Sequence, residues 1–394
     1  MRPLLCIGPA TRSIMQNFSY RNPTEILFGK GMIAEIASRV PADRPVLFLW
    51  GGGSIKKNGV YDQVKAALAK HQLVEFSGVE PNPLHETCLR ALTLVKDRGI
   101  KFILAVGGGS VLDAAKYIAA AAVFPGNDPW EILRTNGSNV TGALPLGAVL
   151  TLPATGSESN GNAVISRKSS SEKLHFASSH VYPVFSVLDP ETTFSLPTKQ
   201  VRNGIVDAFV HVCEQYMTFR EAALLQDRLA ESVLQTLVEV APRTLESPRD
   251  YASRGDFMWS ATIALNNLLS CGVPGDWATH MIGHELTAFY GIDHAESLAV
   301  VMPGLWTHKL AAKSAKLAQY GRRVWNVGDA QTAIDKTEAF FHSLGMPTRL
   351  RDFGIDAEDA ARRVSERFAS RKSAFGEQGD ITAGAAAQIL RSRA

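Results

Sequence analysis

Hydrophobic positions in the first half of the chain occur in short runs that end in glycine. Val46–Trp50 leads into Gly51–Gly53, and Phe102–Val106 leads into Gly107–Gly109. A helix-like segment follows each run. Buried strands that alternate with helices are typical of a largely parallel sheet with helices on both faces. The pattern therefore predicts an α/β domain over residues 1–195.

The spacing of hydrophobic positions changes from Leu196 onward. Apolar residues now recur every three or four positions, which is the period of a helix that packs one face. We expect an all-helical domain over residues 196–394, with a connector around Leu188–Pro197. The clearest periodic segments are Ala222–Val240, Tyr251–Leu269, Pro274–Tyr290 and Lys309–Val324.

Candidate metal ligands lie in two segments of the predicted helical domain. Asp207 and His211 are four residues apart, so a helix places both on one face. His280 and His284 have the same spacing, and His294 follows in an expected loop after a helix that ends near Gly291. A lone histidine is usually structural, but one carboxylate with several imidazoles suits a Zn or Fe(II) ion.

The second glycine run fits a phosphate-binding turn. Gly107–Lys116 follows a strand and opens a helix, where backbone N–H groups and the Ser110 hydroxyl can bind a pyrophosphate. The alternative is a plain strand-to-helix turn, because neither standard nucleotide motif matches.

Two further segments extend the candidate cofactor site. The first glycine run lacks an acidic residue and is followed by Ser54, Lys56 and Lys57. This favours NADP over NAD, because a carboxylate at this place would repel the 2′-phosphate. Thr151–Asn160 is rich in small hydroxyl residues and is a candidate lining of the same cleft.

Composition narrows the class of protein. The 394 residues carry a net charge of +3 without a long basic cluster, so nucleic acid is not an expected partner. No apolar run is long enough to cross a bilayer. The four cysteines, which include Cys6, show no paired spacing, so we expect a reducing, cytoplasmic location. The opening residues make a poor signal peptide, and Met15 is an alternative start to Met1.

The chain resembles the iron-containing, or group III metal-dependent, alcohol dehydrogenases over nearly its whole length. Gly107–Lys116 matches the family's GGGSxxDxxK loop, Thr155–Glu158 its TGSE segment, and Asn22–Gly31 its first hairpin. Val206–His211 and Asp276–His280 are most similar to the branch of NADPH-dependent aldehyde reductases and butanol dehydrogenases. The resemblance implies a dehydroquinate synthase-like fold, with a Rossmann-like dinucleotide-binding domain and an all-α metal-binding domain.

The resemblance also implies roles for individual residues. One divalent ion, Zn or Fe(II), is expected on Asp207, His211, His280 and His294, and a short or medium-chain aldehyde is expected to take a hydride from NADPH there. His280 and His284 are the expected catalytic residues, with His284 or a water molecule relaying the proton. The expected cofactor contacts are Gly108, Gly109 and Ser110 at the pyrophosphate, Asp113, Thr151 and Thr155 near the nicotinamide, Gly52, Gly53, Ser54 and Lys57 at the 2′-phosphate, and Lys173. A homodimer is expected from the family.

Other functions stay open at this point. A dehydroquinate synthase-like lyase or a glycerol phosphate dehydrogenase would need several basic side chains facing the metal, and the sequence between Asp276 and Ala295 has no such cluster. A non-catalytic protein that binds a metal or nucleotide is a further alternative. Asp276, Trp277 and Phe289 suggest an apolar substrate pocket, and the preferred aldehyde is not indicated.

Overall fold

The structure is a computed structural model that describes residues 15–218 and 223–394. Cys6 and Met1 therefore lie outside the described residues, whereas Met15, the alternative start, is the first residue described. The described part contains two sheets: a parallel sheet in the order β1-β8-β5-β4-β2-β3, and a separate antiparallel hairpin formed by β6 and β7. The strands are β1 Glu25–Phe28, β2 Val46–Trp50, β3 Leu73–Phe76, β4 Phe102–Gly108, β5 Leu146–Leu152, β6 Asn162–Arg167, β7 Glu172–Ala177 and β8 Phe185–Leu188.

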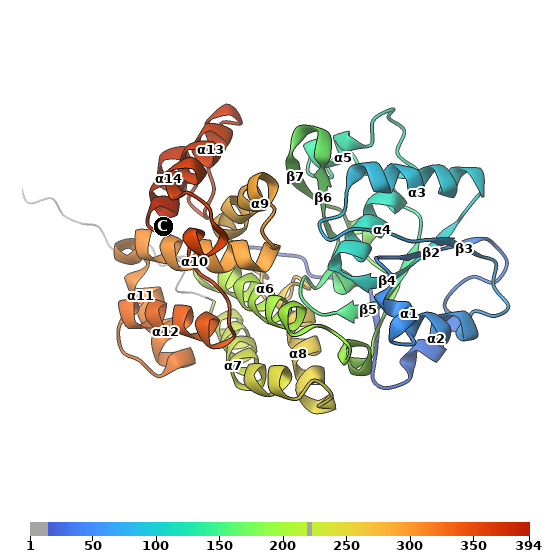
Figure 1. The fold of residues 1–394 in the computed structure, drawn as a ribbon, viewed down its shortest axis with the longest axis horizontal. Coiled ribbons are helices and arrows are strands. Elements are labelled where there is room, and N and C mark those ends of the chain that lie inside the picture. The colour runs from blue at the N-terminus through green and yellow to red at the C-terminus, as the bar shows by residue number, and fades with distance from the viewer. Residues whose placement is uncertain (1–14, 219–222) are drawn as a thin grey trace, which may run out of the picture.

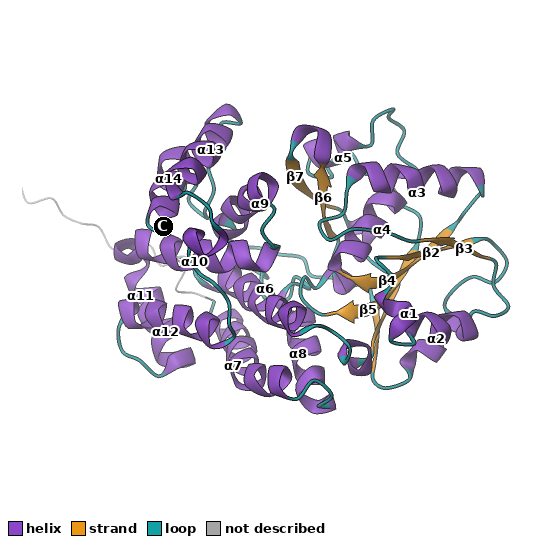
Figure 2. Cartoon of the chain, viewed as in Figure 1, coloured by secondary structure: helices purple, strands orange, loops and turns teal. Residues whose placement is uncertain are grey.

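Helices cover both faces of the parallel sheet, as Figures 1 and 2 show. Alternate residues of β4 point to opposite faces. Ile103 and Ala105 belong to the core under α3 and α4, whereas Leu104 and Val106 belong to the core formed with the 3-10 helix Met32–Ser38 and α2. The helices of this domain are α1 Ser54–Lys57, α2 Val60–Ala67, α3 His85–Asp97, α4 Gly109–Ala121 and α5 Trp130–Arg134.

The opening strand corrects one expectation. Asn22–Gly31 is not a hairpin, because β1 pairs in parallel with β8 from the far end of the domain, and a 3-10 helix follows β1. Parallel partners cannot be joined by a tight turn, so the outermost strand comes from a crossover.

The remainder of the described chain is helical and packs around α6, which is buried from Gly204 to Tyr216. The expected α/β domain followed by an all-helical domain is confirmed, whereas the boundary between residues 195 and 196 stays a prediction. The helices are α6 Thr198–Tyr216, α7 Leu224–Glu246, α8 Tyr251–Ala264, α9 Ala278–Tyr290, α10 His294–His308, α11 Leu310–Tyr320, α12 Ala330–Ser343, α13 Ala357–Ser370 and α14 Ala383–Arg391.

Several helix ends differ from those expected. The helix predicted to end at Val240 continues to Glu246, and the one predicted over Lys309–Val324 is an α-helix over Leu310–Tyr320. The helix from Tyr251 ends at Ala264 rather than Leu269, because the chain turns there through Asn267, whose φ is 71°. The next helix begins at Ala278 rather than Pro274, because Trp277 has a left-handed φ of 60°. His294 is the first residue of α10 rather than a loop residue, and Asp293 caps that helix together with Glu296. The expected start at Ala222 lies outside the described residues.

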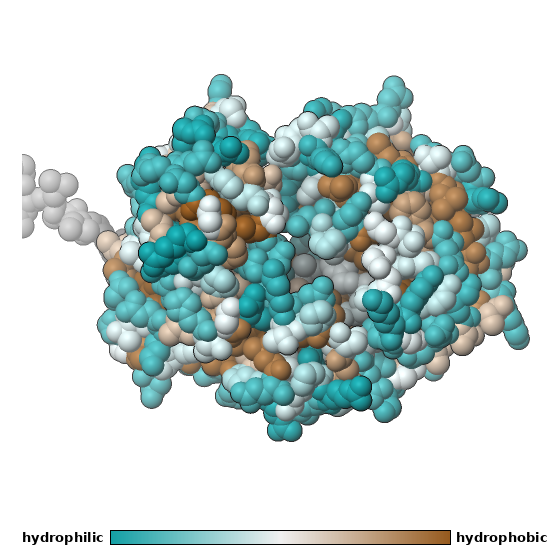
Figure 3. All heavy atoms as spheres, viewed as in Figure 1, coloured by the Kyte–Doolittle hydropathy of each residue, from teal (hydrophilic) through white to brown (hydrophobic). Residues whose placement is uncertain are grey.

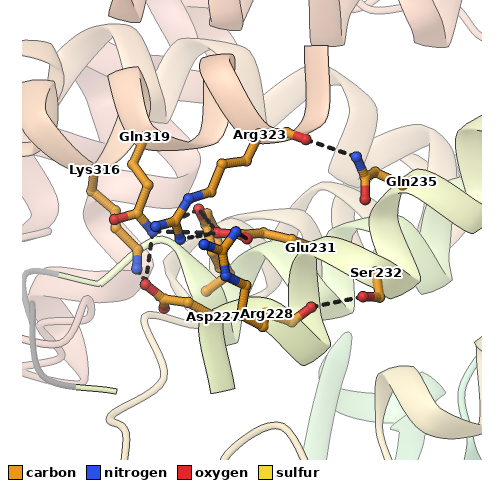
Figure 4. Close-up of polar contacts among 9 residues, drawn as sticks. Asp227, Arg228, Glu231, Ser232, Gln235, Lys316, Gln319 and Arg323 are labelled. Carbon is orange, nitrogen blue, oxygen red and sulfur yellow. Dashed lines mark hydrogen bonds and ion pairs between the residues drawn. The ribbon is translucent and has the colours of Figure 1, made fainter. Parts of the chain in front are cut away.

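A buried polar network joins α7 to α11 in the helical domain (Figure 4). Lys316 Nζ and Gln319 Nε2 donate to the two carboxylate oxygens of Asp227 at 2.6 and 2.7 Å. Arg323 and the Tyr216 hydroxyl both donate to Glu231 Oε1, at 2.7 and 2.8 Å. The carboxylates of α7 are thus paired, as buried charges must be.

The two domains meet at the segment that follows β5. The Thr262 hydroxyl of α8 donates to Glu158 Oε1 at 2.6 Å, and Asn160 Nδ2 donates to the carbonyl oxygen of Leu265 at 3.0 Å. Figure 3 shows a hollow between the domains on the face in view. In the described part of the chain, no helix is long and apolar enough to span a membrane.

Candidate metal centre and nucleotide cleft

Three predicted metal ligands converge between α6, α9 and α10. Asp207, His280 and His294 each offer one ligand atom, and these atoms all lie within 4.8 Å of one another. His211 lies beside this group, with its Nδ1 3.7 Å from Asp207 Oδ1 and its ring stacked on that of His280 at 4.7 Å between centroids. The structure thus brings all four predicted ligands together.

The hydrogen bonding of these four residues fits a divalent ion. Each keeps one buried atom without a hydrogen-bond partner, namely Asp207 Oδ1, His211 Nδ1, His280 Nε2 and His294 Nδ1. Buried polar atoms are rarely left unpaired, so four neighbouring residues with one such atom each call for a further group. One carboxylate and three imidazoles is a donor set for Zn or Fe(II).

Burial keeps the imidazoles ready to donate electron pairs. It lowers the pKa of His211 to about 4 and the pKa of His280 to about 3, with Lys173 a smaller cause at His280. The same two causes hold the pKa values of His284 and His294 well below the usual range. Neutral imidazoles at pH 7 can bind a cation, whereas protonated ones cannot.

Glu214 orients one of these imidazoles, a role that the sequence analysis missed. Its Oε1 accepts from the backbone N–H of His280 at 3.0 Å and lies 2.9 Å from His280 Nδ1. An acceptor at this oxygen places the ring proton on Nδ1 and leaves the lone pair of Nε2 free for an ion. Glu214 falls three residues after His211, on the same face of α6, so its spacing from Asp207 carried the signal.

The predicted phosphate-binding turn lies at the carboxyl end of β4, where α4 begins. Gly108 and Gly109 are in close contact with the segment after β5: a Cβ on Gly108 would lie 2.9 Å from Leu152 Cβ, and one on Gly109 2.5 Å from Thr155 Oγ1. Only glycine fits there. The start of α4 thus lies at the carboxyl edge of the sheet, which is where such sheets bind nucleotides.

Comparison with known proteins gives the family. A model for iron-containing alcohol dehydrogenase matches residues 23–190, and one for the C-terminal part of the Fe-containing alcohol dehydrogenase family matches residues 202–392. The chain belongs to the iron-containing alcohol dehydrogenase family. It is 52% identical to the NADPH-dependent aldehyde reductase YqhD of Escherichia coli over 93% of this chain and 97% of that protein.

Two further comparisons define the likeness. The chain is 43% identical to a probable NADH-dependent butanol dehydrogenase of Bacillus subtilis, over 87% of this chain and 91% of that one. The crystal structure of E. coli YqhD superposes with a TM-score of 0.95 at 50% identity, covering 97% of this chain and all of that chain. The expected dehydrogenase fold is confirmed.

Asp113 and Lys116, the acidic and basic residues of the GGGSxxDxxK loop, form hydrogen bonds to other residues of the α/β domain. Asp113 accepts from the Ser157 hydroxyl at 2.6 Å and from the Val164 N–H at 2.9 Å. Lys116 is fully buried and donates to Ser157 Oγ, Asn160 Oδ1 and the Asn162 carbonyl oxygen at 2.8, 3.0 and 2.8 Å. Both residues thus tie α4 to the TGSE segment. A contact between Asp113 and the cofactor stays a prediction.

The remaining predicted cofactor residues are spread along the sheet edge. Gly52 and Ser54 are exposed after β2, and a Cβ on Gly52 or Gly53 would meet nothing within 4 Å. Lys57 is exposed on α1. Thr151 is buried at the end of β5. The space beside Gly52 leaves room for a phosphate.

Lys173 lies on β7, in the other domain from the metal ligands. Its buried Nζ donates to Asn82 Oδ1 at 2.9 Å. Burial lowers the pKa of Lys173 to about 8, and Asp207 opposes that shift through space. The lysine is therefore near enough to the ligand cluster to affect its charge.

The suggested apolar pocket is only partly supported. Trp277 lies against the cluster, with its ring 5.3 Å from that of His280 and 6.4 Å from that of His211. Asp276 instead forms a buried ion pair with Lys313 at 2.6 Å. Phe289 packs under the guanidinium of Arg367 at 4.6 Å on the α13 side of α9. Phe289 was misassigned because apolar patterning along a helix does not tell which of its neighbours a side chain faces. Asp276 was misassigned because its partner, Lys313, lies on another helix.

Proposed function

We propose that this dehydrogenase reduces short or medium-chain aldehydes to primary alcohols with NADPH, at one divalent ion held by Asp207, His211, His280 and His294. The observation that carries the proposal is that each of these four neighbouring residues keeps a buried polar atom without a hydrogen-bond partner. They lie where helices of one domain face the carboxyl edge of the other domain's sheet. The names of the two relatives, an aldehyde reductase and a butanol dehydrogenase, support the substrate class.

The chain's own residues prepare the chemistry. A bound divalent ion supplies Lewis-acid stabilisation of negative charge on the carbonyl oxygen, and a bound NADPH supplies the hydride. Asp207 lowers the net charge of the site, and Glu214 fixes the ring of His280. His284 lies with its ring 5.2 Å from that of His294, and burial and Lys173 hold its pKa well below the usual range, so the ring is neutral. A neutral imidazole can take a proton from water at one ring nitrogen while it gives the proton of the other to the alkoxide oxygen, which makes His284 a proton relay.

For the cofactor, we assign the pyrophosphate to Gly108, Gly109 and Ser110 at the start of α4. The end of β2 carries no carboxylate in Gly51–Ser54, which supports a 2′-phosphate there with Lys57 as its cation. The relatives' names include both NADPH and NADH, and the absence of a carboxylate at Gly52 supports NADPH for this chain. The nicotinamide side is assigned to Thr151, Thr155 and Lys173, with Asp113 supporting the loop.

Zn and Fe(II) both suit the donor set, and the family name favours iron. The family match gives no support to the lyase or glycerol phosphate dehydrogenase alternatives. A non-catalytic binding protein is disfavoured because all four predicted metal ligands are present in the sequence and lie close together in the structure.

Metal content of purified protein tests the site apart from activity. We expect one Zn or Fe(II) per chain by elemental analysis after loading and dialysis, and loss of most of it in Asp207→Asn and His280→Ala. His308→Ala, an exposed histidine at the end of α10, is the matched control and keeps its metal. Retention of the ion in Asp207→Asn and His280→Ala alike would refute the assignment.

We also propose a cytoplasmic homodimer. Cys88, Cys213 and Cys271, the cysteines of the described chain, are unpaired thiols, as in a reducing compartment. The edge strand β1 exposes Phe28, which meets the exposed Trp259 edge-on at 6.2 Å between centroids. Exposed aromatic pairs at a sheet edge favour association. In sedimentation velocity, the wild type should be a dimer, and Trp259→Arg should dissociate at higher protein concentration than the wild type. A monomeric wild type would contradict the proposal.

A further inference from the structure

A second set of contacts between the domains joins α13 to the tip of the β6–β7 hairpin. Arg371, at the end of α13, has its Nη2 3.2 Å from Glu172 Oε1, and Arg367 Nη1 donates to the carbonyl oxygen of Ser171 at 3.3 Å. The side chains of Arg371 and Glu172 remain 30% and 24% exposed. An ion pair in this setting is weak enough to break and reform.

These contacts differ from those at Glu158 and Asn160. There, the hydroxyl and amide donors are buried, and separating them would leave polar groups unpaired in the interior. The domains are therefore joined firmly beside the TGSE segment and loosely at the hairpin tip. If the domains move apart, the arginine contacts open first.

Both arginines are anchored on α9. Glu285 Oε1 lies 2.7 Å from Arg371 Nη1, and its Oε2 lies 3.4 Å from Arg367 Nη1. The guanidinium of Arg367 also stacks over Phe289. Glu285 follows His284 directly, and Figure 1 shows α9 between α13 and the hairpin. The arginines thus link the hairpin to the helix that carries His280 and His284.

The β6–β7 hairpin carries Lys173 next to Glu172, so contacts at Glu172 affect the position of Lys173. Successive residues of a strand point to opposite faces, so Glu172 reaches the arginines while Lys173 lies on the opposite, buried face. Lys173 is buried with its Nζ on Asn82, within electrostatic range of Asp207. Holding Glu172 therefore holds Lys173.

We propose that Arg367 and Arg371 form a clasp on the hairpin that positions Lys173 at the cofactor cleft and thereby strengthens NADPH binding. Arg367 and Arg371 act through the hairpin and touch neither cofactor nor substrate. The inference rests on the proposed use of NADPH. Opening of the clasp would let the cofactor enter and leave without disturbing the buried junction at Glu158.

The test compares Glu172→Gln, Arg371→Gln and the double variant with Arg362→Gln, an exposed residue of α13 whose ion pairs stay within that helix. Each single change is expected to weaken NADPH binding about fivefold, measured by cofactor fluorescence. Both single changes remove the Arg371–Glu172 ion pair, and Arg371→Gln also removes the ion pair with Glu285, so the double variant is expected to bind NADPH about as weakly as Arg371→Gln alone. Metal content is expected to stay unchanged. Amide exchange of residues 172–177 in cofactor-free protein is expected to quicken in the three clasp variants and not in Arg362→Gln.

Two results would overturn the clasp. One is wild-type amide exchange at residues 172–177 in both Glu172→Gln and Arg371→Gln. The other is an NADPH dissociation constant that changes no more in Glu172→Gln and Arg371→Gln than in Arg362→Gln. Failure of the wild type to bind NADPH would refute the proposed function instead, while amide exchange in cofactor-free protein would still decide whether the clasp holds the hairpin.

Discussion

Replacing Glu214 by alanine should separate metal affinity from fold stability. Its Oε1 serves two N–H groups of His280, one on the backbone at 3.0 Å and one on the ring at 2.9 Å. The backbone hydrogen bond is the same with and without an ion, so its loss costs stability, about 1–3 kcal/mol for a buried unpaired group. The ring hydrogen bond makes His280 a better donor, so its loss costs affinity.

We expect Glu214→Ala to bind Zn about 10–100-fold more weakly, which is about 1.4–2.7 kcal/mol. Glu214→Gln, whose amide oxygen can still accept, should lose less. Competition with a chromophoric chelator measures affinity, and urea unfolding of metal-free protein measures stability. Glu231→Gln, which changes a buried carboxylate of the α7 network (Figure 4), is the control and should lose stability only. Wild-type affinity in Glu214→Ala, or an equal loss in Glu231→Gln, would refute the reasoning.

Four further predictions follow from single positions. Gly52→Asp has steric room, so it should fold normally and raise the KM for NADPH at least about tenfold while sparing NADH, as steady-state kinetics would show. Gly109→Ala should weaken cofactor binding by a similar factor in fluorescence titrations, because its Cβ would displace Thr155, and unchanged binding would remove α4 from the phosphate site. Trp277→Ala should raise kcat/KM for branched aldehydes relative to butanal, since the indole borders His280, and an unchanged ratio would place the substrate elsewhere. In metal-free protein, the pKa of His280 is about 3 in the folded chain and about 6.5 in the unfolded chain. The unfolded chain therefore binds the extra proton, and the free energy of unfolding falls as the pH drops from about 6.5 towards 3. His280→Asn should make the free energy of unfolding depend less on pH, as urea titrations at several pH values would show.

The layered fold was predictable because strand runs and helix periods are local signals. Val46–Trp50 and Phe102–Val106 became β2 and most of β4, and four-residue spacing placed Asp207 with His211 on α6. The parallel pairing of β1 with β8 was not predictable from local pattern, because it depends on a partner about 160 positions away.

Side-chain direction limited the prediction of the site. Nothing in the local sequence tells that Phe289 faces α13 while Trp277 faces the histidines, since both belong to one apolar stretch. Helical spacing places Glu214 on the same face of α6 as Asp207, so the sequence made it a candidate site residue. Its contact with His280 could not be predicted, because His280 lies on another helix. Contacts between elements, such as Arg371 with Glu172, arise only from tertiary packing.

The central claim, metal-dependent reduction of aldehydes by NADPH, is tested most directly by following NADPH and NADH separately at 340 nm with butanal. The wild type would be assayed after chelation and after reloading with Zn or Fe(II), beside His280→Ala. The account predicts that the wild type oxidises NADPH faster than NADH, that chelation abolishes this activity, and that reloading with metal restores it. It predicts that His280→Ala does not oxidise NADPH. Oxidation that survives both chelation and the substitution, or no oxidation of either cofactor by metal-loaded protein, would contradict it.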